Sequence, residues 1–274
     1  MTAVTPVQHM TAGQQRASGE ARLVLKPLLG RTRIGALYQE GCAKLRFPRC
    51  GDREAVVINT SGGLTGGDRL RLSASIGPGC RAQMTTQACE KIYKASAGEA
   101  SVSTEIEVGR AASFAWLPQE TIVFDRSALD RSLDVRLAGD ASALIVEAVA
   151  FGRKAMGERV ARASFRDRWR IWRDGRMIHA EDLRVGPDFG LIAGRPALLS
   201  GAGAIATVLL AGDGDTRHLD AVRSIIGENG GASAWSGKLL ARLFDTDAYS
   251  LRKRLVPLIR LLNGKAGLPR AWSI

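Results

Sequence analysis

Residues 69–76, RLRLSASI, alternate strictly between polar and apolar side chains. In an extended chain successive side chains point to opposite faces, so all the apolar residues of this stretch share one face. The turn sequence GPG follows at 77–79, and residues 81–86 and 101–108 repeat the alternation. This period of two predicts half-buried strands in antiparallel or stacked sheets.

Further segments extend the expectation of a mainly β chain. The nearly continuous apolar run ALIVEAVAF at 143–151 predicts a strand covered on both faces. Residues 165–171 predict a strand that reverses at Asp174-Gly175, and residues 239–243 predict another. The uncharged run 196–212 is shorter than the ~20 apolar residues of a membrane-spanning helix, and its glycines favour two buried strands joined by a turn.

Two segments near the C-terminus have the helical period instead. Residues 216–227 place their apolar side chains on one helical face, with Asp215 as the expected N-cap and Gly227 as the stop. Residues 246–263 repeat this pattern over a longer stretch and end at an Asn-Gly pair. We therefore expect two late helices on a β scaffold.

The first twenty residues differ from the rest of the chain. Residues 1–20 are small and polar without periodicity, which predicts a disordered tail. No Pro- or Ser-rich linker divides the remaining sequence, so residues 21–274 are expected to form one β-rich domain.

The number and spacing of the cysteines indicate the redox environment of the protein. The chain has four cysteines, none in C-x-x-C spacing: Cys42, Cys50, Cys80 and Cys89. They are expected to be small, half-buried hydrophobes in a reducing environment. No basic region followed by an apolar stretch begins the chain, so a cytoplasmic location is expected.

The net charge of +12 is unevenly distributed. Residues 151–184 carry +5 and residues 238–274 carry +6, whereas residues 61–150 carry −2. A basic surface attracts nucleic acid, anionic membrane or acidic protein partners, and charge alone does not choose among them.

Common catalytic motifs are missing from the sequence. The Gly-Lys pair Gly237-Lys238 has neither the spacing nor the hydroxyl residue of a P-loop. No serine stands in G-x-S-x-G, and His9, His179 and His218 are far apart. These absences argue against a nucleotide-binding site and against a hydrolase, although the residues of a dispersed triad meet only in the fold and would not show as a motif.

Polar residues are instead dense between residues 59 and 125. Their carboxylates would suit a divalent ion, with water or a thiol as a further ligand. The alternative is that they anchor loops and are otherwise solvated, since polar loop residues are common.

Five segments in this order resemble the urease accessory protein UreD (UreH) family. They are VINTSGGLTGGDRL at 57–70, TTQACEKIY at 85–93, WLPQETIVFD at 116–125, FGRKAMGE at 151–158 and LPRAW at 268–272. The combination is specific, whereas no single short motif among them would be.

The resemblance implies a fold and a role. The fold would be mainly β, with stacked β-sheets in a helix-like arrangement and two α-helices near the C-terminus. The chain would be a non-enzymatic chaperone and scaffold in the cytoplasm that binds UreF and, through it, the GTPase UreG. That assembly would dock on the urease apoprotein and conduct nickel into its active site. Neither nucleic acid nor a membrane would be a partner.

Within these motifs we expect a transient nickel (Ni²⁺) path with no tightly bound cofactor. Its candidate groups are the carboxylates of Asp68, Glu90, Glu120 and Asp125. A carrier must release its ion, and oxygen donors do so more readily than a Cys/His cage. The alternative is that these carboxylates cap turns or pair with neighbouring basic residues.

A basic nucleic-acid-binding β module is the rival function. It rests on the arginines of residues 151–184 and on Phe165, Trp169 and Trp172, which would stack on bases. Strand alternation explains the same spacing, with the arginines on the solvated side, and we favour that explanation.

Overall fold

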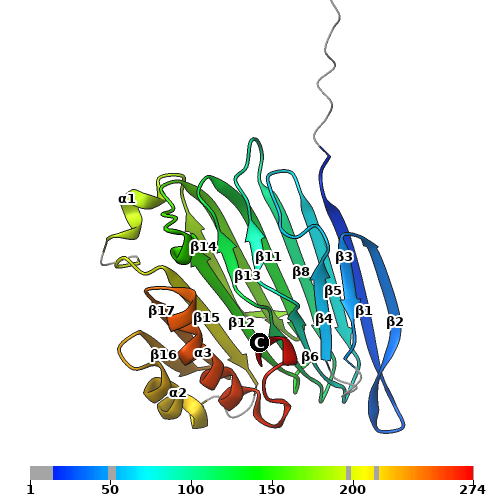
Figure 1. Cartoon of the computed structure of the whole chain (residues 1–274). Helices are drawn as coiled ribbons and strands as arrows, with labels where there is room; N and C mark the ends of the chain where they lie inside the picture. The colour runs from blue at the N-terminus through cyan, green and yellow to red at the C-terminus, as the bar shows by residue number, and fades with distance from the viewer. Residues whose placement is uncertain (1–14, 49–53, 196–198, 213–215, 274) are drawn as a thin grey trace, which may run out of the picture.

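The computed structural model describes residues 15–48, 54–195, 199–212 and 216–273, whose strands form two sheets packed face to face (Figure 1). The first sheet has the strand order β14 (Arg176–Val185), β13 (Ala163–Arg173), β11 (Ser127–Leu137), β8 (Ala100–Val108), β5 (Arg69–Ile76), β1 (Ser18–Leu28) and β2 (Arg31–Gly41). The second has the order β16 (Gly230–Trp235), β17 (Lys238–Asp245), β15 (Ala204–Ala211), β12 (Ser142–Phe151), β9 (Ser113–Leu117), β6 (Arg81–Thr86), β4 (Glu54–Asn59) and β3 (Ala43–Arg46). In the second sheet β10 (Thr121–Val123) also pairs with β12, and β7 (Glu90–Ile92) pairs with β10.

The chain coils between the two sheets from β4 to β13. Apart from the short β7 and β10, consecutive strands belong to opposite sheets, so each full turn of the coil returns the chain to the same sheet in the same direction. Strands β1, β5, β8, β11 and β13 are therefore parallel neighbours, as are β4, β6, β9 and β12. The expected helix-like stacking of sheets is confirmed.

Two apolar cores result from this arrangement. One lies between the sheets, and the other lies between the second sheet and the helices α2 (Leu219–Ile226) and α3 (Ala248–Leu262). Figure 1 shows these helices together beside β15–β17. Strand β12 is covered on both faces, as its apolar run predicts, and all of its residues except the first and last are buried.

The other alternating segments are also strands. Residues 69–76, 81–86 and 101–108 lie in β5, β6 and β8, and each strand turns its apolar residues toward the core between the sheets. The strand expected at 165–171 is the middle of β13, and Asp174-Gly175 forms the turn to β14.

The prediction of two strands in residues 196–212 is wrong. Only β15 lies there, because Ser200 and Gly201 both have positive φ and form a turn, while residues 196–198 lie outside the described part of the chain. The first expected late helix is shorter than predicted. Helix α2 stops before Gly227 as expected, but it begins at Leu219, and Asp215 is outside the described residues.

Helix α3 begins after Asp247, whose side chain accepts a hydrogen bond from the N–H of Ser250. A five-residue helix, α1 (Phe189–Ala193), was not expected from the sequence. Short 3₁₀ turns lie at Lys154–Met156, Thr216–His218, Gly264–Ala266 and Arg270–Ser273.

Strand β1 begins at Ser18, inside the segment expected to be a tail, and residues 1–14 lie outside the described residues.

Cys80 is buried, and Cys42 and Cys89 are half-buried; all three are unpaired, and Cys50 is outside the described residues. No described helix has the length and apolar character needed to cross a membrane.

Candidate functional site

Three of the resemblance segments meet where β7 and β10 pair. These parallel strands place Glu90 opposite Thr121, and the N–H of Glu90 donates to the carbonyl of Glu120 at 3.1 Å. On the other side, the N–H of Leu64 donates to the carbonyl of Lys91 at 2.7 Å. The loops that follow β4, β6 and β9 are thereby joined side by side.

The two remaining segments reach the same region. The N–H of Gly152 donates to the carbonyl of Val123 at 2.8 Å, immediately after β12. From the C-terminus, the indole Nε1 of Trp272 donates to the carbonyl of Leu117 at 2.9 Å. All five segments are therefore neighbours in space, although they are spread over most of the chain.

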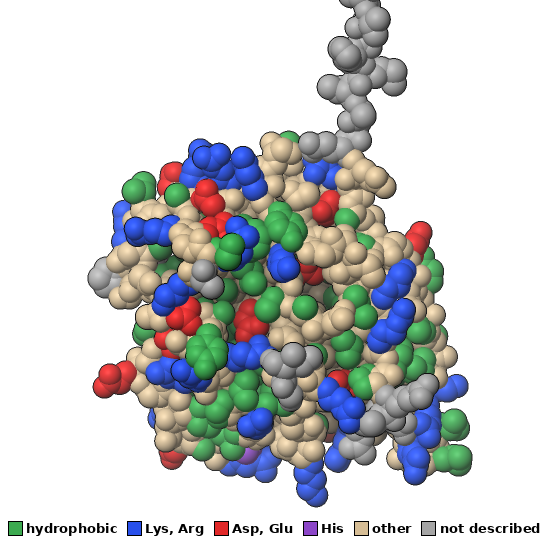
Figure 2. All heavy atoms as spheres, in the orientation of Figure 1, with side chains coloured by type: hydrophobic (Ala, Val, Ile, Leu, Met, Phe, Trp, Pro, Cys, Tyr) green, Lys and Arg blue, Asp and Glu red, His purple; other side chains and the backbone are tan. Residues whose placement is uncertain are grey.

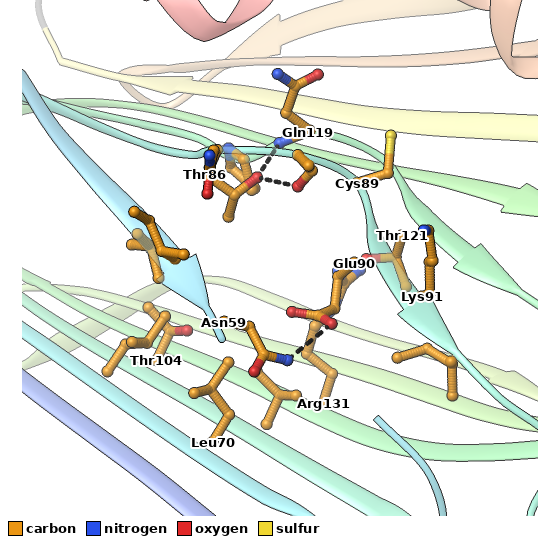
Figure 3. A pocket seen from close by; sticks show the side chains of 18 of the residues that line it. Asn59, Leu70, Thr86, Cys89, Glu90, Lys91, Thr104, Gln119, Thr121 and Arg131 are labelled. Atoms are coloured by element: carbon orange, nitrogen blue, oxygen red, sulfur yellow. Dashed lines mark hydrogen bonds between the residues drawn. The ribbon is translucent and has the colours of Figure 1, made fainter. Parts of the chain in front are cut away.

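A cavity of about 190 Å³ lies between the sheets in this region, toward the carboxyl ends of β4, β6 and β9 (Figure 3). Its apolar walls include Leu70, Leu72, Val102 and Leu129. Its polar lining comes from both sheets and includes Asn59, Glu90, Lys91, Thr104, Thr121, Arg131 and Glu147. Such a lining can hold water or a small polar species.

Glu90 is the carboxylate that borders this cavity without a cationic partner among the described residues. Its Oε1 accepts a hydrogen bond from Asn59 Nδ2 at 3.0 Å, and Figure 3 shows the two side chains directed toward one another. Burial raises the pKa of Glu90 to about 7, although the bond from Asn59 opposes the shift. Near neutral pH both the protonated and the ionised form of Glu90 are therefore populated.

Arg131 crosses the space between the sheets beside this cavity. From β11 its Nε and Nη2 donate to the two carboxylate oxygens of Asp167 at 3.0 and 2.7 Å. Its Nη1 donates to Glu147 Oε2 at 2.5 Å and to Thr121 Oγ1 at 3.1 Å, both in the second sheet. The guanidinium therefore joins the two sheets, and we call Arg131, Glu147 and Asp167 the buried charge cluster.

The charged groups of the buried charge cluster all have hydrogen-bond partners. The indole Nε1 of Trp116 donates to the second oxygen of Glu147 at 2.8 Å. Burial by itself would lower the pKa of Arg131, but the two carboxylates outweigh it and leave the pKa above its usual value. Burial raises the pKa of Glu147, and the contact with Arg131 opposes that rise.

Glu120 lies on the other face of the same strand pair, because side chains alternate along a strand. It is 3% exposed, and both its oxygens accept from Arg252 Nη1 of α3, at 3.0 and 3.1 Å. The thiol of Cys89 donates to Glu120 at 3.4 Å. Burial and then the Glu120 charge raise the pKa of Cys89 to about 11, so this thiol is a poor metal ligand at neutral pH.

Asp68 and Asp125 hold loops. Asp68 is 4% exposed and accepts from the N–H groups of Ala17 and Thr65, both at 2.8 Å. Asp125 accepts from the N–H groups of Ala161 and Arg162, both at 2.9 Å, and the bond from Arg162 is the main reason why its pKa is lowered. Both carboxylates thus make the kind of contact expected from the alternative in which these residues anchor loops.

The four predicted carboxylates do not form one cluster. Within the described ranges no group of three or more His, Cys, Asp or Glu side chains is placed to hold a metal ion. Of the four, only Glu90 lines the cavity, together with amide and hydroxyl groups and the charged side chains of Lys91, Arg131 and Glu147. Chemically, this arrangement offers a few hard oxygen donors for brief contact and no tight cage.

The buried charge cluster was not anticipated from the sequence. A signal was present, because Arg131 and Asp167 stand in the inward phase of alternating strands, between buried apolar residues two positions away on either side. Glu147 similarly interrupts the apolar run of β12. A charge at an inward position needs a buried partner, and three such charges indicate a cluster.

The stacking argument for nucleic-acid binding is wrong for two of its three aromatic residues. Phe165 and Trp169 are fully buried between the sheets and cannot reach a base. The arginines between them face outward, where Arg166 pairs with Asp182 at 2.7 Å and Arg168 pairs with Asp130 at 3.0 Å. Strand alternation accounts for this pattern.

Comparison with known proteins confirms the resemblance to the UreD family. The family described as UreD urease accessory protein matches residues 17–273. A protein named urease accessory protein UreD from Mesorhizobium japonicum is 54% identical over 95% of each chain. Proteins of the same name from Brucella suis and Rhizobium leguminosarum bv. viciae are 52% and 56% identical, and the alignments cover 97% and 95% of this chain and 98% and 96% of theirs. The chain therefore belongs to the UreD family of urease accessory proteins.

Proposed function

We propose that this chain is a non-enzymatic subunit of a urease maturation complex and that nickel passes through it. In this proposal it binds a UreF-like protein and, through that protein, a UreG-like GTPase, and the assembly docks on urease apoprotein. Membership of the UreD family and relatives named urease accessory proteins support this role. The GTP-binding motif, missing from this sequence, would then belong to the partner.

The position of Glu90 is the observation that supports passage of nickel through the chain. Glu90 is a carboxylate beside an internal cavity, with a neutral amide as its side-chain partner instead of a cation. Its negative charge would attract a dication, while the few neighbouring oxygen donors would hold that ion weakly. Weak binding is what transit requires, since a tight site would not release its ion.

The other three carboxylates rank below Glu90 as nickel contacts. Glu120 would have to exchange its contact with Arg252 for one with the ion. Asp68 and Asp125 would have to give up backbone hydrogen bonds that hold their loops. We therefore expect substitution of Glu90 to affect nickel transfer most directly.

The partner surfaces would include residues 151–184 and 246–272. Helix α3 lies in the second range and leaves Tyr249 71% exposed, with Lys253 and Arg260 also exposed. Figure 2 shows Lys and Arg side chains spread over this face between apolar ones. Positive charge at the rim of an interface chiefly speeds association with an acidic partner.

The test combines assembly with metal transfer. The chain and its Glu90→Gln variant are each co-expressed with UreF-like and UreG-like proteins and urease, and the nickel content of purified urease is measured. Glu107→Gln, on the exposed face of β8, is the matched control. We expect Glu90→Gln to assemble normally and to lower nickel content, with the control at the wild-type level. Full nickel in every variant that assembles, including Ala variants of the four carboxylates, would refute the carboxylate path.

The non-enzyme part has its own test. The purified single chain is assayed for GTP hydrolysis and for urea hydrolysis, and neither activity is expected. Turnover that persists through further purification and scales with the amount of this chain would overturn that part of the proposal.

A further inference from the structure

A second hollow lies at the other end of the parallel strands. The Glu90 cavity is near the carboxyl ends of β6 and β9, whereas this groove borders the first residues of β6, β9 and β12. Its volume is about 1040 Å³, and the loop 263–270 that follows α3 forms one wall. Because the two hollows lie at opposite strand ends, a role for one does not depend on the other.

The rim of the groove is basic. Arg81, Arg217, Lys265 and Arg270 line it, and all four are exposed. Among the described residues none of these four side chains pairs with a carboxylate, unlike the arginines on the outer face of β13. Figure 2 shows Lys and Arg side chains along the lower edge of the molecule, below the region of α2 and α3.

The two carboxylates of the groove already have partners. Glu54 accepts from Gln83 Nε2 at 2.9 Å, and Asp140 accepts from the N–H of Ala111 at 2.8 Å. Gln83 in turn accepts from Asn263 Nδ2 at 2.9 Å, which ties the wall after α3 to β6. The groove is therefore already formed by internal hydrogen bonds, and among its described residues four cations stand against these two carboxylates.

The floor of the groove is apolar. Phe114 and Leu144 contribute from the second sheet, with Leu261 and Leu262 at the end of α3. The volume is at the upper limit of the ~300–1,000 Å³ usual for small-molecule sites. A phosphate backbone would satisfy the basic rim but would leave this apolar floor uncovered.

We propose that this groove docks an acidic amphipathic segment of a partner protein. The apolar side chains of that segment would cover the floor, and its carboxylates would face the four cations on the rim. Apolar contact at the centre with charge at the rim is the usual anatomy of a protein interface. This inference rests on the proposed function only in that the partner belongs to the maturation complex.

The test uses the full chain, with the UreF-like protein and urease apoprotein as the two binding probes. The groove variant is Arg217→Glu/Lys265→Glu, which changes two lining cations from different segments of the chain; neither is in an ion pair in the described structure. Arg69→Glu/Arg71→Glu, exposed on β5, is a control with the same change of charge. Dissociation constants are measured at about 0.05 M and about 0.5 M NaCl, because salt screens surface charge.

We expect the groove variant to bind one probe at least about tenfold more weakly at low salt, since exposed ion pairs and rim charges have additive modest effects. The difference should shrink at high salt, and the control should bind like the wild type. A photo-crosslinking residue in place of Ala266 should label a partner segment rich in carboxylates and apolar side chains.

Three outcomes would overturn the inference. If the wild type forms complexes and the groove variant binds equally well, the groove proposal fails and the proposed function stands. If the wild type binds neither probe, both proposals fail. If the variant keeps both partners but loses affinity for a DNA duplex probe, the groove serves a nucleic acid instead.

Discussion

Replacing Glu90 by Gln should stabilise the folded chain at pH 8 and change its stability little at pH 4. The folded-state pKa of Glu90 is raised to about 7 from an ordinary value of 4.5, because burial penalises the charged form. Below pH 4.5 the group is protonated in both states, so folding carries no ionisation penalty. Between pH 4.5 and 7 the unfolded chain ionises first, and the stability of the fold falls as pH rises.

The folded-state and ordinary pKa values of Glu90 set the size of this change in stability. A shift of 2.5 pKa units corresponds to at most about 3.4 kcal/mol, reached above pH 7. Water that enters the cavity reduces this penalty, so we expect Glu90→Gln to gain about 1–3 kcal/mol at pH 8. The Gln carbonyl oxygen can still accept the bond from Asn59, so little else changes.

Urea unfolding at the two pH values measures this difference directly. Glu107→Gln, exposed on β8, controls for the loss of one negative charge and should show no comparable dependence on pH. The reasoning would be refuted if Glu90→Gln shifted the free energy of unfolding equally at pH 4 and pH 8. A loss of stability at pH 8 would instead mean that the ionised carboxylate has a favourable partner.

Three further substitutions probe the scaffold through the free energy of unfolding. Arg131→Met should cost about 3–5 kcal/mol, because it leaves Glu147 and Asp167 buried without a cation; a cost below about 1 kcal/mol would contradict this. Trp272→Ala should cost about 3–5 kcal/mol, since this buried ring packs in the core between the second sheet and the helices α2 and α3; a neutral result would mean that the C-terminal segment adds no stability. Asp247→Ala removes the N-cap of α3 and should cost about 0.5–2 kcal/mol near neutral pH. This last cost should shrink as acid protonates Asp247, whose folded-state pKa is lowered mainly by the N–H of Ser250, and a cost independent of pH would exclude capping by the carboxylate.

Strand positions were predictable where one face of a strand enters the core. Strands β5 and β8 show strict alternation because every second residue packs between the sheets. Strand β2 gave no such signal, and most of its residues are exposed, since it lies at the edge of the first sheet. Polar and apolar residues alternate only where one face of a strand is buried. A strand with little burial therefore shows no such alternation in its sequence.

Pairing between strands could not be predicted in the same way. The alternation of β5 and β6 fixes which side chains point inward, but it does not say whether the turn at 77–79 joins neighbours in one sheet or crosses to another. The structure shows a crossing, with β5 and β6 in opposite sheets. That choice depends on contacts between strands distant in sequence, and here the family resemblance supplied it.

The candidate site was predictable as a region but not as a geometry. The motifs containing Glu90 and Glu120 are adjacent, yet their carboxylates occupy opposite faces of the sheet. The register of β7 with β10 decides this, and a shift of one residue would exchange the faces. Asp68 and Asp125 illustrate a second limit, because nearby backbone N–H groups occupy carboxylates that look available in the sequence.

The buried charge cluster shows how stability and the cavity are related. An apolar set of equal volume in place of Arg131, Glu147 and Asp167 would often be as stable, because burying charges costs solvation that their attraction barely repays. It would also make this part of the cavity wall apolar, and apolar cavities of this kind stay dry. Arg131 and Glu147 instead keep hydrogen-bonding groups at the wall that Glu90 shares. The cluster thus holds the two sheets together at a cost in solvation, and it keeps the cavity wall between them polar.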